Sequence, residues 1–520
     1  MSLLPFLAVA IVGTVIATLL RDIRRLGTLV GLGAVVVALA AACLINPDTP
    51  LGIGGGALAG SDHLRLVLTL CLGGGLLVLV VARLSTWQPS APGALLGGAA
   101  GIGLALGLAG TPPGLLGAAA ATIAASAIAL GSPAAPSRIR ALARELRGAA
   151  TSLVIGIIAA GIVPGTAAAR APGAGPAEPA AAALVLLGMA LVVAHRFGAI
   201  PLHARVSRLA DAAPSGALPI LAAWLPAAWG LVILGWAPAA LGPSSAGLGL
   251  ERSLVVTLAL ATLLLGTVAA LIQDEVEHVV AYTIVADAGV ALLALAALDP
   301  AARDAARAWV LVFATTRTAM IGWTIAFRAA FGTGRLRDTT GWLRRAPALG
   351  VALAGILVAA VGWPGLLAWD ARLAILQSAT AGPALLLAYA GSLGTGAAIC
   401  RLLVVGGGRP SPIVAGSLGE LPRLPERPPA GAAAPVTDGP PPVGAIARAA
   451  ARARRLRVAA GVVGRDARRT LELNRVPLRA FAVIMLGGLA LLTAAGAFGI
   501  DAAARAPGPV LPSLSPFVGG

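Results

Sequence analysis

The chain alternates between long apolar blocks and short polar breaks along most of its length. A helix of about 20 apolar residues crosses a hydrocarbon core of about 30 Å. Fourteen blocks of roughly this kind occur, at residues 3–20, 27–45, 63–82, 93–110, 112–131, 149–167, 179–196, 217–236, 252–272, 277–298, 307–330, 346–376, 381–404 and 478–499. The pattern predicts an all-α fold: a polytopic membrane bundle of about fourteen transmembrane helices.

The composition excludes a soluble domain. Of the 520 residues, 58% are hydrophobic and only 11% are charged, whereas a soluble domain carries about 25% charged residues. The 38 residues counted as lysine plus arginine are all arginine, and a buried arginine does not change its protonation as a buried lysine can. The three cysteines stand far apart in apolar blocks, so they predict neither a metal site nor a disulfide framework.

The arginines mark alternate loops, as the positive-inside rule requires. If the N-terminus lies outside, the inner loops hold the arginines of residues 21–25, 83, 138–147, 205–208, 328–345 and 409–475. An even number of spans then places both termini outside the plasma membrane. One inner loop breaks the rule, because Gln273–His278 is acidic.

One long stretch is not membranous. Residues 405–442 are rich in proline and glycine and predict a flexible cytoplasmic linker. Residues 443–470 carry eight arginines among alanines and valines, which is typical of a basic amphipathic helix lying on anionic lipid headgroups. Since the membrane surface is its expected partner, no nucleic-acid role is expected. The chain therefore divides into a thirteen-span bundle at 1–404, this linker, this surface helix and a final transmembrane helix at 478–499.

Ionisable residues within or beside the spans are the candidate functional residues. A charged side chain at a helix centre costs about 2.5–3.5 kcal/mol on insertion scales, so each one needs a partner or a role. The candidates for a proton or ion path are His195, Arg196, His203, Glu277, His278, Asp287, Arg317, Asp370 and Arg372. Each of them could instead be a structural charge, and Glu277 and His278 could sit at the headgroup level.

Three of these charges lie deep within spans. Asp287 stands ten residues beyond Glu277 in the tenth span, too far for headgroup solvation. Arg317 and Arg372 are too distant from the span ends to snorkel easily. Pairing of these two arginines with Asp287 and Asp370 would be the least costly arrangement.

Two prolines predict helix breaks. Pro201 follows the seventh span, and Pro364 stands within the sequence Gly-Trp-Pro-Gly in the twelfth. A broken helix at membrane depth frees backbone groups to face water or an ion. The breaks therefore coincide with the candidate ion path.

No catalytic arrangement accompanies these charges in the sequence. We find no phosphate-binding loop, no paired-cysteine motif and no serine–histidine–acid set on an exposed scaffold. The sequence also lacks a ligand set for a metal or a cofactor, so any redox chemistry is expected to reside in another chain.

Three separated segments carry a family pattern. Residues 194–219 read AHRFGAIPLHARVSRLADAAPSGALP, and residues 273–289 read QDEVEHVVAYTIVADAG. The third segment, 338–372, places in order Asp338, Gly341, Pro347, Gly362, Pro364, Trp369 and Arg372. Together they resemble the antiporter-like membrane subunits of respiratory complex I (NADH–quinone oxidoreductase, subunit N or M type) and of Mrp-type cation–proton antiporters.

The resemblance covers roughly residues 60–400 and agrees with the fourteen-span count. It implies a bundle with broken helices and inverted repeats, and other membrane subunits as partners. It also implies a relay in which glutamates and lysines on broken helices pass protons through a half-buried aqueous path.

The relay positions that the resemblance implies are altered. Arg196 and Arg372 stand where the family has lysines, Glu277-His278 replaces a lysine–arginine pair, and Asp287 replaces a histidine. A buried lysine can release its proton, whereas arginine keeps it. Two relay positions have therefore become fixed charges.

Two further relay positions are apolar. The fifth span, 112–131, contains no acid where the family has a glutamate, and Pro226 lies near the place of another lysine. The acidic loop that breaks the positive-inside rule belongs to the same departure from the family.

Three functions remain open at this point. The chain could take part in proton or cation translocation by a rewired path through Glu277, His278, Asp287 and Asp370, with the buried arginines setting the field. It could instead be a non-conducting scaffold subunit of such an assembly, itself non-catalytic. The rival from another class is an independent secondary transporter, which would act without partner subunits.

Overall fold

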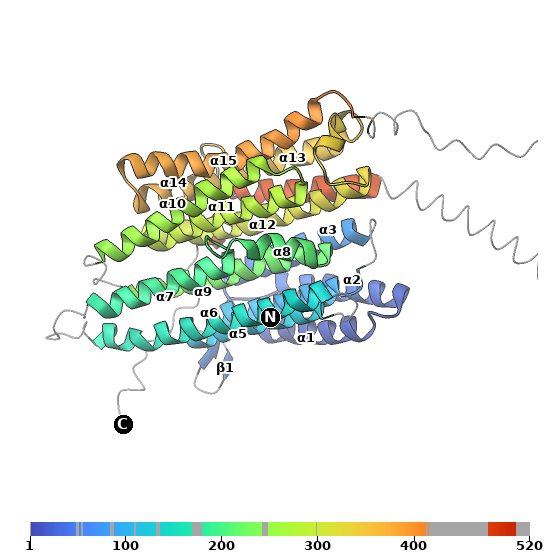
Figure 1. Ribbon diagram of the computed structural model, residues 1–520. Helices are drawn as coiled ribbons and strands as arrows, with labels where there is room; N and C mark the ends of the chain where they lie inside the picture. The colour runs from blue at the N-terminus through green and yellow to red at the C-terminus, as the bar shows by residue number, and fades with distance from the viewer. Residues whose placement is uncertain are drawn as a thin grey trace, which may run out of the picture.

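The structure, a computed structural model, describes residues 2–47, 51–53, 56–83, 88–108, 111–131, 136–168, 179–241, 248–297, 299–411, 414 and 477–505. Its long helices lie side by side in one bundle (Figure 1). The predicted all-α membrane fold is confirmed.

The helices follow the order of the apolar blocks. Those of the first half are α1 (Leu3–Leu19), α2 (Arg24–Cys43), α3 (Asp62–Arg83), α4 (Ala91–Gly107), α5 (Thr111–Leu130), α6 (Pro136–Ala168), α7 (Pro179–Phe197), α8 (Ala204–Ala212) and α9 (Leu225–Leu241), the last preceded by the 3₁₀ turn η1 (Ser215–Ala217) and the π-helical η2 (Ile220–Trp224). Those of the second half are α10 (Gly249–Ile272), α11 (Val276–Ala296), α12 (Pro300–Phe331), the 3₁₀ turns η4 (Arg337–Thr339) and η5 (Trp342–Arg344), α13 (Pro347–Val361), α14 (Leu367–Ala379), α15 (Gly382–Gly407), the helix Pro477–Ala495 and α18 (Ile500–Arg505).

The span count agrees with the sequence. Eleven of the described helices are long and apolar enough to cross a membrane. Three shorter apolar helices, Leu3–Leu19, Ala91–Gly107 and Pro347–Val361, occupy the remaining predicted blocks. The chain is therefore a multi-pass membrane protein.

Two helices are interrupted at corresponding places in the two halves. Residues 198–203 separate α7 from α8, and Pro201 lies in this interval with a cis peptide bond before it. Residues 362–366 separate α13 from α14, and Pro364 lies in that interval. Gly362 adopts a positive φ of 76°, a conformation that favours glycine, and so turns the chain at the end of α13.

A small hairpin adds to the helical prediction. β1 (Leu51–Ile53) and β2 (Gly56–Leu58) pair antiparallel in the connection between α2 and α3. Ala59 then donates its backbone N–H to the carbonyl of Gly107, at 2.8 Å, which attaches this connection to the end of α4.

The centre of the bundle is formed by α11 and α12, which run between α7 and α9 on one side and α13 to α15 on the other (Figure 1). In the apolar 18-residue stretch of each span, all residues are buried in Ala301–Phe331 and 94% in Val276–Ala296, against 33% in Leu26–Cys43. Outer helices expose large apolar side chains, such as Leu29 at 65% and Leu265 at 55%. Charges in the middle of α11 or α12 are therefore isolated from both lipid and bulk water by other helices.

Glycines let α10 and α11 approach closely. A Cβ atom at Gly289 would lie 2.6 Å from the carbonyl oxygen of Ala259, and one at Gly266 would lie 2.6 Å from the backbone nitrogen of Ala286. These positions lack room for any side chain, as is typical of small-residue contacts between membrane helices.

The polar stretch after α15 is described only at its start. α15 extends to Gly407, and the hydroxyl of Ser411 donates to the carbonyl of Asp338 at 2.5 Å. Apart from residue 414, the rest of the predicted linker and all of the predicted surface helix 443–470 lie outside the described residues. Those two expectations stay predictions.

Candidate functional site

A buried ion pair lies at the centre of the bundle, where α11 and α12 face each other. Asp287 accepts hydrogen bonds from Arg317, whose Nε and Nη2 lie 2.6 and 2.5 Å from Asp287 Oδ2. Only 5% of the Asp287 side chain and 2% of the Arg317 side chain are exposed. The pairing expected for these two residues is therefore present.

The second expected pair does not form. Arg372, on α14, instead donates to the carbonyl oxygens of Ala360 and Val361, in the last turn of α13. Asp370 is exposed and has no ion pair within the described part of the chain. Residues two apart on a helix do not face each other, and the carbonyls at a helix end need donors. The expectation that Asp370 pairs with one of the two buried arginines is wrong for these reasons.

We call Asp287, Arg317 and Arg372 the central cluster. Arg372 is close enough to interact electrostatically with both other members, attracted by Asp287 and repelled by Arg317. The cluster thus holds one acid and two arginines. One arginine compensates the acid, and the other satisfies backbone that the helix break leaves open.

A second ionic cluster lies at the break between α7 and α8. Arg205 donates to both carboxylate oxygens of Glu145, each at 2.8 Å, and Arg196 lies 3.5 Å from Glu145 Oε2. Arg205 also donates to the carbonyl of Arg196 at 2.6 Å. We call Glu145, Arg196 and Arg205 the arginine cluster.

Glu145 was missed by the sequence analysis. The predicted sixth span, 149–167, does not include it. α6 begins earlier, at Pro136, and therefore carries Glu145 into the bundle. The available signal was its isolation: it is the single acid among the arginines of residues 138–147. The fifth span lacks the family's glutamate, but α6 supplies an acid to Arg196.

Arg196 is wholly buried, with 0% of its surface exposed. Its guanidinium carbon lies 5.7 Å from the centroid of the Trp229 ring, a cation–π distance. Its Nε and Nη1 find no hydrogen-bond partner among the described residues. Next to it, His195 is hydrogen-bonded through Nδ1 to the Ser152 hydroxyl at 3.1 Å.

A cavity of about 420 Å³, which we call the vestibule, reaches from one end of the bundle toward the central cluster. The ion pair between Glu277 and Arg328 lies at its exposed end, with 25% and 56% of these side chains exposed. Its walls continue along α11 to Ile284 and along α12 to Ile321. Asp287 and Arg317 lie within one helical turn beyond these residues, so the cavity ends close to the buried pair.

The acidic loop before α11 pairs with the arginine-rich segment after α12. Asp274 lies 2.7 Å from Arg337 and 3.7 Å from Arg401. The backbone joins as well, because Leu336 donates to the carbonyl of Asp274 at 2.8 Å. The acids that break the positive-inside pattern are therefore neutralised by the arginines of a neighbouring loop.

The two candidate histidines near this face differ. His278 lies between two acids, with Nε2 3.2 Å from Asp211 and Nδ1 3.7 Å from Glu275. His203 precedes α8, and its Nδ1 is buried without a partner in the described residues. Neither histidine belongs to the central cluster.

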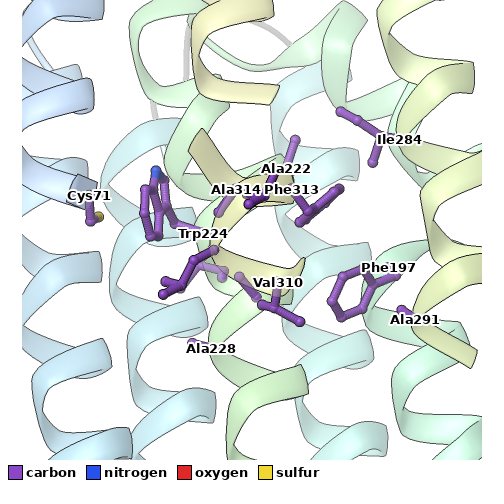
Figure 2. Close-up of a cluster of buried hydrophobic side chains, with 14 of the residues drawn as sticks. Cys71, Phe197, Ala222, Trp224, Ala228, Ile284, Ala291, Val310, Phe313 and Ala314 are labelled. Atoms are coloured by element: carbon purple, nitrogen blue, oxygen red, sulfur yellow. The ribbon is translucent and has the colours of Figure 1, made fainter. Parts of the chain in front are cut away.

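An apolar layer lies between the two clusters. Figure 2 shows Phe197, Val310 and Phe313 packed together at the bundle centre. The rings of Phe197 and Phe313 are 5.4 Å apart. Phe197 directly follows Arg196, and Phe313 lies one turn before Arg317, so aromatic side chains separate the two sets of charges.

The chemistry available at these sites is charge stabilisation and proton binding. Within the described residues, no three histidine, cysteine or acidic side chains are placed to hold a metal ion. The arginines supply permanent positive charge. The acids Glu145, Glu277 and Asp287 and the histidines His195, His203 and His278 are side chains that can gain or lose a proton.

Comparisons with known proteins agree with this architecture. Residues 172–397 match the family model described as NADH:quinone oxidoreductase/Mrp antiporter, TM. NADH-quinone oxidoreductase subunit N of Laribacter hongkongensis is 27% identical over 206 residues, which is 38% of this chain and 40% of the relative. The subunit N 2 of Acidobacterium capsulatum is 30% identical over 159 residues, 30% of this chain and 29% of the relative. The matches thus span two fifths or less of these relatives' length.

Solved structures share the fold over a longer range. A chain of respiratory complex I from Thermus thermophilus with bound NADH superposes with a TM-score of 0.65 at 17% identity, over 95% of this chain and 98% of that chain. A chain of the Mrp complex from Dietzia sp. DQ12-45-1b gives 0.65 at 19% identity, over 77% and 47%. Over residues 172–397 the chain is thus similar to the NADH:quinone oxidoreductase/Mrp antiporter membrane family, and its fold resembles that of antiporter-like membrane subunits.

Proposed function

We propose that this chain is a membrane subunit of a complex I-like or Mrp-like multisubunit assembly in the plasma membrane, with both termini outside. Its relatives are named as NADH-quinone oxidoreductase subunits, and its structural neighbours are chains of multisubunit membrane complexes. In such an assembly this chain takes part in moving protons, or other cations, while any redox cofactor resides in other subunits.

The observation that carries the proposal is the vestibule that ends beside a buried acid. A carboxylate deep in a membrane bundle is costly unless it has a role or a partner. Asp287 has the partner, Arg317. It also lies within one helical turn of Ile284, which lines the vestibule of about 420 Å³. We assign to Asp287 the role of proton-exchanging group.

The surrounding charges then have defined roles. Glu277 and its partner Arg328 lie at the mouth of the vestibule and control access to it. Arg317 and Arg372 keep their protons and provide a constant field at Asp287. Protonation of Asp287 weakens its pairing with Arg317, so proton uptake couples to a rearrangement of the central cluster.

A specific observation favours the scaffold alternative. Asp287 and Glu145 are each held by an arginine, at 2.5 and 2.8 Å. Such charge-assisted hydrogen bonds are strong and hold each acid against its arginine. The Phe197–Phe313 layer also separates the two clusters, and an apolar layer opposes the transfer of protons from one cluster to the other. A subunit built this way supplies a packing surface without conducting.

Proton flux through the reconstituted assembly distinguishes the two functions. Asp287→Asn removes the proton-exchanging group and is expected to abolish the flux that this subunit contributes. Asp304→Asn, an exposed acid on α12, is the matched control and is expected to leave flux unchanged. Asp370→Asn tests the remaining candidate acid; because Asp370 is exposed and lacks an ion pair with the described residues, little loss is expected. Undiminished flux in Asp287→Asn would establish the scaffold function.

A further inference from the structure

A second cavity opens beside the arginine cluster and has no role in the proposed proton route. We call it the basic cavity. Its volume is about 340 Å³, within the range of about 300–1,000 Å³ that is typical of ligand sites. It is lined by residues of α6, of the end of α7, and of the break and α8, among them Arg144, Glu145, Gly148, His195, Leu202 and Arg208.

Positive charge is in excess around this cavity. Arg144, Arg205 and Arg208 line it together with a single acid, Glu145. That acid is already bound by Arg205 through both carboxylate oxygens. Arg144 and Arg208 are exposed, and neither makes a hydrogen bond or an ion pair with a described residue. Two guanidinium groups at the rim therefore lack an anion.

Further N–H groups lie at the floor of the cavity, around Gly148. A Cβ atom at Gly148 would lie 3.1 Å from His195 Nε2 and 3.4 Å from Arg196 Nη1. His195 uses its other ring nitrogen on Ser152, and Arg196 Nη1 has no partner among the described residues. The absent side chain leaves these nitrogens next to the cavity, and buried donors of this kind normally have an acceptor.

The position of the cavity selects the kind of anion. It lies at the end of α7 in an arginine-rich part of the chain, on the side that the positive-inside rule assigns to the inner leaflet. Exposed apolar side chains lie on the same elements: Leu202 lines the cavity and is 37% exposed, and Leu191, one turn before His195 on α7, is 48% exposed. A phospholipid has a phosphate that can bind the arginines and acyl chains that can contact the exposed leucines. Free phosphate can bind the arginines but makes no apolar contact.

We propose that the basic cavity binds the phosphate of an anionic phospholipid. Arg144 and Arg208 hold the phosphate at the rim, His195 Nε2 donates to it from the floor, and the acyl chains lie along Leu191 and Leu202. Basic pockets between membrane helices on the cytoplasmic side are a recurring form of lipid-headgroup site. This assignment is independent of whether the chain conducts protons.

Native mass spectrometry of the full chain released from nanodiscs tests the proposal. Nanodiscs contain either phosphatidylglycerol or phosphatidylcholine. Arg144→Gln/Arg208→Gln is expected to lower the retained phosphatidylglycerol about tenfold. Arg140→Gln/Arg147→Gln is the matched control, because these arginines are exposed on α6 and do not line the cavity; it is expected to retain lipid as the unmodified chain does.

Three outcomes would overturn the assignment. Equal retention of phosphatidylcholine would show that the lipid's charge is not recognised. Equal loss in both double variants would show a diffuse charge effect. Displacement of phosphatidylglycerol by excess inorganic phosphate, with phosphate itself retained, would identify free phosphate as the ligand. Arg144→Lys/Arg208→Lys keeps the charge and is expected to retain most of the lipid, which separates lost binding from lost folding.

Discussion

A charged cluster of the same composition lies at each of the two helix breaks, but the hydrogen bonds within the two clusters are arranged differently. Each cluster has one acid and two arginines, and in each an arginine donates to carbonyls in the last turn of the helix before the break. In the arginine cluster, Arg205 performs both tasks, since it binds Glu145 and the carbonyl of Arg196. In the central cluster the tasks are divided, because Arg317 binds Asp287 while Arg372 binds the backbone.

This difference determines where N–H groups are left without hydrogen-bond partners. Division of the tasks gives every member of the central cluster a hydrogen-bond partner and leaves only Arg372 Nε, among the described residues of the cluster, without one, so the cluster can be enclosed by helices. In the arginine cluster the shared task leaves Arg196 with two unpartnered N–H groups in the described structure, beside an open cavity. The same three charges thus form a cluster enclosed by helices in one half of the chain and a cluster beside an open cavity in the other.

The largest expected effect comes from removing the acid that pairs with Arg317. Asp287→Ala is expected to lower the free energy of unfolding by about 3–5 kcal/mol, because Arg317 would remain buried without an anion. Unfolding of the full chain in detergent micelles measures this loss. Asp287→Ala/Arg317→Met removes both charges and is expected to recover most of it. A double variant as unstable as the single one would refute the pairing argument.

A smaller effect is expected from removing the arginine that donates to the backbone carbonyls at the end of α13. Arg372→Met removes the donors to the carbonyls of Ala360 and Val361 and is expected to cost about 2–3 kcal/mol of unfolding free energy. The same micelle assay applies, with exposed Arg345→Met as the control. If Arg372→Met cost as much as Asp287→Ala, Arg372 would be a second partner of the acid and the division of tasks would be wrong.

The arginine cluster is expected to tolerate loss of its acid better than the central cluster. Glu145→Gln is expected to cost about 1–3 kcal/mol, since the neighbouring basic cavity lets water solvate the freed arginines. The variant keeps hydrogen-bonding capacity at the same position. A loss above that of Asp287→Ala, measured in the same micelles, would show that the two clusters are equally enclosed.

The smallest effect is expected where the ion pairs are exposed. Asp274→Asn breaks pairs with Arg337 and Arg401, but 42% of the Asp274 side chain is exposed. Exposed pairs contribute about 0–1 kcal/mol, and salt screens them. Unfolding at low and high salt checks this, because any loss seen at low salt should disappear at high salt.

Much of the architecture was predictable because a lipid environment leaves few choices. Apolar blocks long enough to span a membrane must be helical, so the spans could be counted from hydropathy. The burial cost of Asp287 and Arg317 also predicted that each of them needs a partner of opposite charge. These inferences depend on local length and on energy alone.

The errors have a common cause, which is that hydropathy does not report helix boundaries or side-chain direction. Glu145 was assigned to a loop because α6 begins with a basic, weakly apolar turn, although the helix continues through it. Asp370 was expected to pair with one of the two buried arginines, but its two-residue spacing from Arg372 points their side chains apart. Only packing placed Glu145 opposite Arg196 and Arg372 against the end of α13.

By itself, the sequence determined that this chain is a membrane bundle, which spans it has, where two of them break and which charges need partners. The tertiary structure decided which partners those charges find, which of them remain unsatisfied and where cavities lie beside them. The physical reason is the range of the forces. Transfer from water to lipid is set by the composition of each segment, whereas an ion pair or a cavity depends on helices far apart in the chain meeting at atomic distance.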